Sequence, residues 1–193
     1  MKRQITREDA LIIVDVQNDF CPGGALAVPE GDKVVPVLNR YITLFQQAGA
    51  PIFATRDWHP PDHCSFQSRG GIWPPHCIQG SDGAAFHPEL KLPPDVTVIS
   101  KATSPDQEAY SGFAGTDLAD QLRQRGVKTV YVGGLATDYC VKSTVLDALQ
   151  AGFQTVFLRD ASAGVEVNPG DCQQAIAAMK QAGATEATMD DFV

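Results

Sequence analysis

Short apolar runs alternate with longer amphipathic segments along most of the chain, and this alternation limits the fold more strongly than any other feature. It begins with the run at residues 10–14 and the segment 34–47, where apolar residues recur at helical spacing. Runs that are apolar throughout are typical of parallel strands that helices cover on both faces. The sequence therefore predicts a single three-layer α/β domain over residues 1–193.

The same pattern places the remaining elements. Short apolar runs predict further strands at residues 51–55, 96–100, 129–133, 155–158 and 185–189. Amphipathic segments that end near a glycine predict helices at residues 117–125, 138–150 and 170–181.

Composition excludes several classes of partner. A net charge of −8 without a cluster of lysine and arginine argues against nucleic acid. No apolar run approaches the roughly 20 residues that span a bilayer, which argues against a membrane partner. Five scattered cysteines, in a chain large enough to fold without disulfides, fit a reduced, cytoplasmic protein. We expect a small-molecule partner.

The stretch at about residues 58–94 interrupts the alternation. It shows no sustained period and contains all 4 histidines and both tryptophans. Loops longer than roughly 12–15 residues are usually either functional or disordered. Because disordered segments are poor in aromatic residues, we interpret this Pro- and His-rich loop as functional.

Reactive side chains follow four of the predicted strands, in the order Asp15, Asp57, Lys101 and Cys140. In open parallel sheets, binding sites lie at the carboxyl ends of the strands, where the strand order reverses. We therefore expect these four side chains to meet at one edge of the sheet.

Cys140 lies in a glycine-containing turn in which Thr137 or Asp138 can cap the helix that follows. Free amides and the positive end of a helix stabilise a thiolate and can hold an oxyanion. From its position alone, Cys140 is either a nucleophile or a buried, inert thiol.

Asp15 and Lys101 also allow both a catalytic and a purely structural interpretation. A carboxylate at the end of an apolar strand is costly to bury without a partner, and Lys101 can pair with Asp15 and support developing negative charge. The alternatives are an aspartate bound to loop amides and a solvated lysine.

Asp57 and His59 offer a carboxylate and an imidazole, which are side chains of the kind that bind zinc, iron or manganese. In extended backbone these two side chains point the same way, and the loop can return His76 to complete three ligands. Exposed histidines in a polar surface loop are the alternative, and we interpret His87 in that way.

Several aromatic side chains lie near these positions, namely Phe20, Trp73, Tyr110 and Tyr139. Core packing is the default role of such residues, and a flat slot for a ring is the alternative.

Six segments, in this order, resemble the nicotinamidase/pyrazinamidase branch of the isochorismatase-like cysteine hydrolases: residues 14–20, 57–60, 73–77, 101, 110–113 and 134–141. The resemblance covers nearly the whole chain. It implies a doubly wound sheet of about six mainly parallel strands with helices on both faces. It also implies hydrolysis of nicotinamide to nicotinate and ammonia, with pyrazinamide as a second substrate, in pyridine nucleotide (NAD) salvage.

The resemblance further implies residue roles. The catalytic triad falls on Asp15, Lys101 and Cys140, and Cys140 forms a thioester. The amides of Ala136 and Cys140 form an oxyanion hole, next to a cis peptide between Leu135 and Ala136.

A divalent metal ion is also implied, with zinc in first place and iron or manganese as alternatives. Its ligands fall on Asp57, His59 and His76, and His63 is a candidate for a fourth, variable position. The substrate-binding positions are Phe20, Trp73, Tyr110, Leu135 and Tyr139.

Two other functions stay open at this point. One is a related amidase on the same fold, acting on a streptothricin-type, carbamoyl or ureido compound. The other is a non-catalytic binding protein, although such a protein is expected to lack the nucleophile or the base. Some members of the branch form homo-oligomers, so self-association stays open too.

Overall fold

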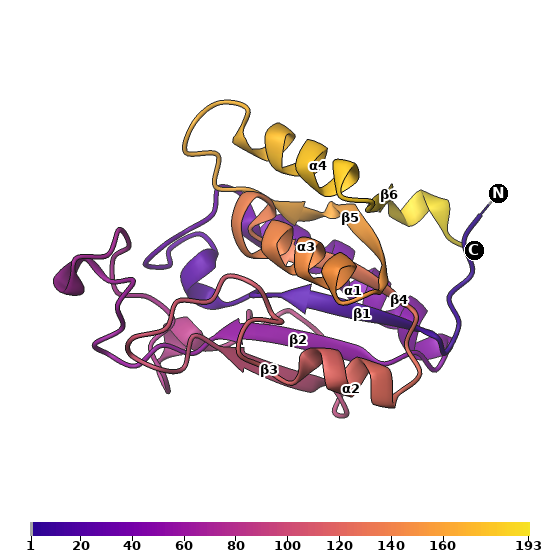
Figure 1. Ribbon diagram of the computed structural model, residues 1–193, viewed down its shortest axis with the longest axis horizontal. Helices are drawn as coiled ribbons and strands as arrows, with labels where there is room; N and C mark the ends of the chain where they lie inside the picture. Colours follow the sequence, from indigo (N-terminus) through magenta and orange to yellow (C-terminus); the bar gives the residue numbers. More distant parts are fainter. Residues whose placement is uncertain (1) are drawn as a thin grey trace.

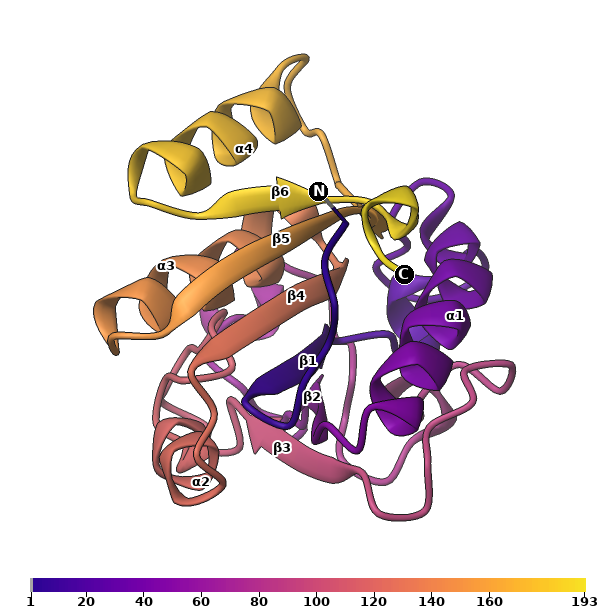
Figure 2. The ribbon, with the colours of Figure 1, turned by 90° about the vertical axis from the view of Figure 1, so that its right-hand side faces the viewer.

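A sheet of six parallel strands, in the order β3-β2-β1-β4-β5-β6, forms the centre of the computed structural model, which describes residues 2–193. Figures 1 and 2 together show the strands side by side. Their bounds are β1 Asp9–Val14, β2 Ile52–Asp57, β3 Thr97–Lys101, β4 Thr129–Leu135, β5 Gln154–Ala163 and β6 Thr185–Ala187. This doubly wound arrangement confirms the predicted fold class.

Helices cover both faces of the sheet. One face packs against α1 (Val34–Gln47), and the other packs against α2 (Leu118–Gln124), α3 (Lys142–Gln150) and α4 (Asp171–Gln181). Figure 2 shows α1 on the opposite side of the sheet from the other three helices. The central strands are therefore buried between two layers, which explains why β1 is apolar and buried throughout. No helix among residues 2–193 is long and apolar enough to cross a membrane.

The strand order reverses at β1. The chain runs outward from β1 through β2 to β3, and then returns to place β4 on the other side of β1. Val14 at the end of β1 pairs with Thr55 on one side and with Gly134 on the other. A Cβ at Gly134 would lie 2.2 Å from the carbonyl oxygen of Val14, so this close pairing requires glycine.

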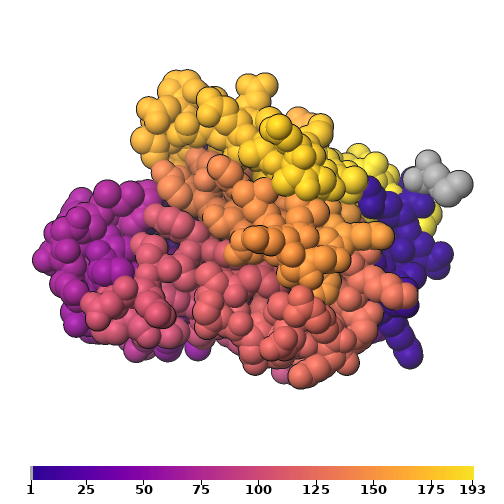
Figure 3. Space-filling model, viewed as in Figure 1, coloured from indigo at the N-terminus to yellow at the C-terminus, as the bar shows by residue number. Residues whose placement is uncertain are grey.

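The long loop after β2 lies beyond the carboxyl ends of the strands. In Figure 1 its purple and magenta segments gather past the arrowheads of β1 and β2, and in Figure 3 they form one end of the molecule. Its regular structure is limited to two short 3₁₀ turns, Gln67–Arg69 and Asp82–Ala84, and a few isolated β-bridges. The predicted loop therefore covers the edge where the reactive side chains were expected.

Two predicted elements differ most from the structure, and the bounds of the others agree to within two residues. The helix expected at residues 138–150 begins as a π-helical turn, Thr137–Val141, before α3. The strand expected at residues 155–158 extends to Ala163, because its second half continues alongside the end of β4 after an irregularity in register.

Candidate active site

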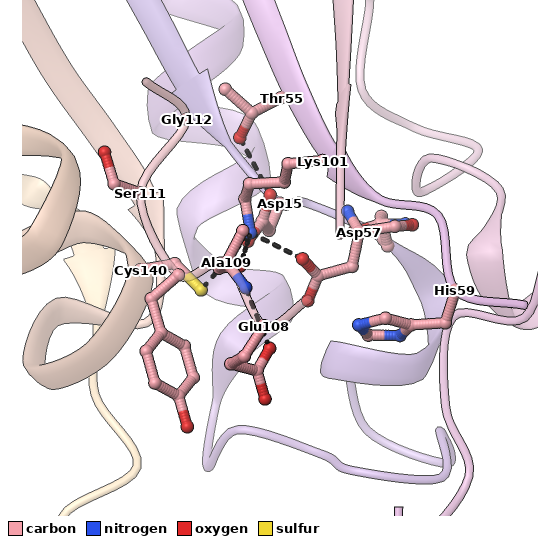
Figure 4. Close-up of polar contacts among 12 residues, drawn as sticks. Asp15, Thr55, Asp57, His59, Lys101, Glu108, Ala109, Ser111, Gly112 and Cys140 are labelled. Carbon is pink, nitrogen blue, oxygen red and sulfur yellow. Dashed lines mark hydrogen bonds and ion pairs between the residues drawn. The ribbon is translucent and has the colours of Figure 1, made fainter. Parts of the chain in front are cut away.

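A buried lysine joins the reactive side chains at the sheet edge. Lys101 ends β3, and its Nζ lies 2.8 Å from Oδ2 of Asp15 and 3.6 Å from Sγ of Cys140. It also donates a hydrogen bond to Oδ1 of Asp57. Figure 4 shows these groups pointing toward one another from neighbouring strand ends. The structure therefore brings together all four side chains that the sequence placed at this edge.

Asp15 is fixed from the side of β2. The residue follows β1 with a left-handed backbone (φ 51°), and its N–H donates to the carbonyl of Thr55. Its Oδ1 accepts the hydroxyl of Thr55 at 2.8 Å. The other oxygen, Oδ2, forms the ion pair with Lys101 and, unlike Oδ1, is not held by a hydroxyl group. Oδ2 is therefore the oxygen that can take up a proton.

Burial sets the protonation states of this cluster. It raises the pKa of the Asp15 carboxyl, and Lys101 opposes that rise. It also raises the pKa of the Cys140 thiol well above its usual value, again against Lys101. Burial alone would lower the pKa of the Lys101 ammonium, but the Asp15 and Asp57 carboxylates raise it well above its usual value. The resting cluster thus holds a neutral thiol beside a charged lysine and a carboxylate of increased basicity.

The backbone around Cys140 forms the end of a cavity. The π-helical turn Thr137–Val141 follows β4, and the carbonyl of Ala136 accepts N–H groups from Tyr139 and Val141. The peptide between Leu135 and Ala136 is cis, as expected.

The capping expectation for this turn is wrong. The turn has no side-chain cap, and the carboxylate of Asp138 instead accepts the N–H groups of Val165 and Glu166. The side chain therefore holds the loop after β5 against the turn that carries Cys140.

A narrow cavity opens above the thiol. It is lined by Phe20, Leu26, Val28, Asp57, Trp73, His76, Tyr110, Leu135, Ala136, Tyr139, Cys140 and Val165. All five side chains predicted to bind the substrate are among them. The indole N–H of Trp73 donates to the hydroxyl of Tyr110 at 3.1 Å, which fixes two of the aromatic walls. The cavity is therefore largely apolar, with a few polar groups at one end, as is usual for small-molecule sites.

Leu26, Val28 and Val165 are wall residues that the sequence did not identify. They carry no reactive group, and the fold brings them to the cavity from two loops distant in the chain. No local sequence signal distinguishes them from ordinary core residues.

Three side chains at the cavity fit a metal ion. Ligand atoms of Asp57, His59 and His76 all lie within 4.8 Å of one another. Nδ1 of His59 is hydrogen-bonded to the carbonyl of His76, and Nδ1 of His76 to that of Pro74, at 2.9 and 2.8 Å. A nitrogen that faces a carbonyl must carry the proton, so Nε2 of each ring keeps its lone pair for a metal.

His63 is arranged differently. Its Nδ1 contacts the hydroxyl of Ser65 at 2.7 Å and its Nε2 contacts the carbonyl of Gln107 at 2.8 Å. Both ring nitrogens therefore have protein partners in this arrangement, although the centre of the ring lies 4.4 Å from that of the His59 ring.

The fold and the cavity together define a class of protein. A thiol beside a carboxylate of increased basicity, at the floor of a cavity for a small molecule, is suited to covalent hydrolysis through a thioester. The chain thus has the fold and the site features of the cysteine-dependent α/β hydrolases.

Comparison with known proteins identifies the family within this class. Residues 9–191 match the isochorismatase domain, and the chain belongs to that family. The chain is 44% identical over 204 residues to the nicotinamidase of Escherichia coli, a match that covers 95% of this chain and 96% of that protein.

Solved structures agree with this assignment. The pyrazinamidase of Pyrococcus horikoshii, in complex with zinc, is 55% identical, with a TM-score of 0.91 over 94% of this chain and 99% of that one. PnC1 from L. infantum, in complex with nicotinate, is 36% identical, with a TM-score of 0.92 over 100% of this chain and 99% of that one.

Proposed function

We propose that this protein is a nicotinamidase that hydrolyses nicotinamide to nicotinate and ammonia, and that it also deamidates pyrazinamide. The observation that carries the proposal is that Cys140 and the metal-ligand candidates Asp57 and His76 line one cavity with aromatic walls. The names of the similar enzymes from E. coli and P. horikoshii support the same substrates. Such an enzyme acts in the cytoplasm, in keeping with five free cysteines.

Asp15 is the general base and acid of the reaction. Its Oδ2 accepts the proton of the Cys140 thiol, and the sulfur attacks the carbon of the amide. Asp15 then returns the proton to the amide nitrogen, the C–N bond breaks, and ammonia leaves a thioester on Cys140. Asp15 next removes a proton from a water molecule, which attacks the thioester. Nicotinate departs, and the sulfur regains its proton.

Charge that develops during both attacks is stabilised by fixed donors. Lys101 carries a positive charge 3.6 Å from the sulfur, and it holds Asp15 in place. The backbone amides of Ala136 and Cys140, which both line the cavity, donate to the oxygen of the tetrahedral intermediates.

Asp57, His59 and His76 hold one divalent metal ion, with His63 outside the set in the arrangement observed. One carboxylate and two imidazoles suit zinc, iron and manganese, and zinc is the metal bound to the similar pyrazinamidase. When bound, the ion orients the pyridine ring and increases the acidity of a nearby water molecule.

The aromatic walls select a flat substrate. Phe20, Trp73 and Tyr110 border the pyridine ring, and Leu135 and Tyr139 complete the slot. A flat ring between these walls places its amide carbon next to Cys140, which lines the same cavity.

Ammonia release from a panel of amides tests the proposal. Nicotinamide and pyrazinamide should be the best substrates, and benzamide, which has the same shape without a ring nitrogen, should react at least about tenfold more slowly, a loss of about 1.4 kcal/mol. A carbamoyl or ureido compound with a higher kcat/KM than nicotinamide would overturn the proposal and favour a related amidase.

A further inference from the structure

The backbone of Asp57 lacks a strand partner on one side. Along a parallel strand, the N–H and C=O groups of alternate residues point to opposite neighbours. Thr55 faces β1, where its carbonyl accepts the N–H of Asp15, and Trp58 faces β3, where its N–H donates to the carbonyl of Lys101. Asp57 faces the side of β1, but β1 ends at Val14.

A side chain takes the place of the missing strand. The Oε1 of Gln17 accepts the N–H of Asp57 at 2.9 Å, and the Nε2 of Gln17 donates to the carbonyl of Asp57 at 2.8 Å. The second N–H of the same amide donates to the carbonyl of Ala84 at 2.9 Å. Gln17 is fully buried, and a buried amide is tolerated only when its hydrogen bonds are satisfied, as they are here.

Asp19 reaches the two histidines through one peptide unit. Its Oδ2 accepts the N–H of Cys77 at 2.8 Å. The carbonyl of the same peptide unit belongs to His76, and it accepts Nδ1–H of His59 at 2.9 Å. The carboxylate, the peptide and the imidazole therefore form one chain of hydrogen bonds.

The other contacts of Asp19 keep this chain in place. Its Oδ1 accepts the N–H of Ala25, next to the cavity wall. A Cβ at Gly83 would lie 2.1 Å from Oδ2 of Asp19, so glycine lets that turn pack directly against the carboxylate. The carbonyl of Cys77 in turn accepts the N–H of His59 at 2.9 Å.

We propose that Gln17 and Asp19 are positioning residues for the metal ion: Gln17 fixes the backbone of Asp57, and Asp19 fixes and polarises His59 through the His76–Cys77 peptide. The inference rests on the proposed metal site of Asp57, His59 and His76. Hydrogen bonds in a chain strengthen one another, so a carboxylate at one end increases the basicity of the imidazole nitrogen at the other. Neither side chain lines the cavity or touches the substrate.

The test is zinc affinity, measured by competition with a chromophoric chelator on folded, metal-free protein. Gln17→Met keeps the volume of the side chain and removes its three hydrogen bonds, and Asp19→Asn keeps its shape and removes its charge. Loss of an outer hydrogen-bond partner of a metal ligand typically weakens metal binding by about 10–100-fold, and we expect each variant to show such a loss. Cobalt(II) absorption supplies a second readout, because the bands should shift in Asp19→Asn when His59 becomes a weaker donor.

Asn18→Ala is the matched control. Asn18 lies between the two residues and donates one exposed hydrogen bond to the carbonyl of Asp82, without contact to a ligand or its peptide. Its zinc affinity and cobalt spectrum should equal those of the unchanged protein. His59→Ala tests the metal site itself and should lose zinc.

The outcomes distinguish the metal site itself from the positioning role of Gln17 and Asp19. If His59→Ala loses zinc while Asp19→Asn and Gln17→Met bind it as tightly as the control, the positioning role is wrong and the metal site stands. If His59→Ala keeps zinc, the proposed metal site fails as well. Asp19 is partly exposed, so Asp19→Asn provides the decisive result even if the buried Gln17 position does not tolerate methionine.

Discussion

Lys101 is the single cation between two buried carboxylates, so replacing it with methionine should be strongly destabilising. Its side chain is completely buried, and Asp15 and Asp57 lie on either side. Removal of one partner from a buried ion pair costs about 3–5 kcal/mol, because the remaining charge is left uncompensated. For a chain of 193 residues, at about 2–4 °C for each kcal/mol, the melting temperature should fall by roughly 6–20 °C.

The loss of stability in Lys101→Met should also depend on pH. Burial raises the pKa of Asp15 in the folded protein, and without Lys101 that pKa rises further. A carboxyl with a raised pKa holds a proton that the unfolded chain releases, so the folded state loses stability as pH rises from about 4 toward the raised pKa. The difference between Lys101→Met and the unchanged protein should therefore be smaller at pH 5 than at pH 8.

Thermal unfolding of metal-free protein, followed by circular dichroism, measures both effects. Lys128→Met is the matched control, because Lys128 forms an exposed ion pair with Glu8, and exposed pairs contribute about 0–1 kcal/mol. A Lys101→Met variant as stable as Lys128→Met at pH 8 would refute the electrostatic account of the cluster.

Three further predictions concern the metal site and the cavity. His59→Ala should lose the bound metal, whereas His63→Gln should keep it, because both ring nitrogens of His63 have protein partners. Elemental analysis measures the metal content of each variant, and metal loss from both would restore His63 as a ligand. Burial lowers the pKa of His59 to about 3, so the unfolded chain takes up a proton at a higher pH than the folded protein does. The metal-free protein should therefore lose stability as pH falls from about 6.5 toward 3. A flatter dependence of stability on pH in His59→Gln would bear this out, and an identical dependence would contradict it. Phe20→Ala should reduce kcat/KM for nicotinamide by about 10–200-fold, mainly through a higher KM, and an unchanged KM would remove Phe20 from the ring site.

Much of the fold could be predicted because its signals are local. The apolar run at residues 10–14 and the helical period of 34–47 correspond closely to β1 and α1. The beginning of α3 could not be predicted in the same way. The π-helical turn before it depends on contacts with the loop after β5, and Asp138 is used there rather than as a cap.

The site could be predicted from the sequence where a reactive side chain follows directly on a predicted strand. The pairing of Lys101 with Asp15 followed from two charged groups at the carboxyl ends of strands in one sheet, and the structure confirms it at 2.8 Å across the intervening strand β2. The contact of Lys101 with Asp57 was not foreseen, because Asp57 was interpreted only as a metal ligand. Gln17 was also missed, since its role depends on where β1 stops relative to β2, and a sequence does not show how two strands are staggered.

The most direct test of the account is ammonia release by Cys140→Ala, with metal content measured on the same sample. Cys140 supplies the sulfur for the thioester, and it has no contact with His59 or His76 among its hydrogen bonds. We expect the variant to keep its full complement of metal and to release no ammonia from nicotinamide above the level of the buffer. Turnover within about tenfold of the unchanged enzyme, a difference of only about 1.4 kcal/mol, would show that the thiol is not the nucleophile.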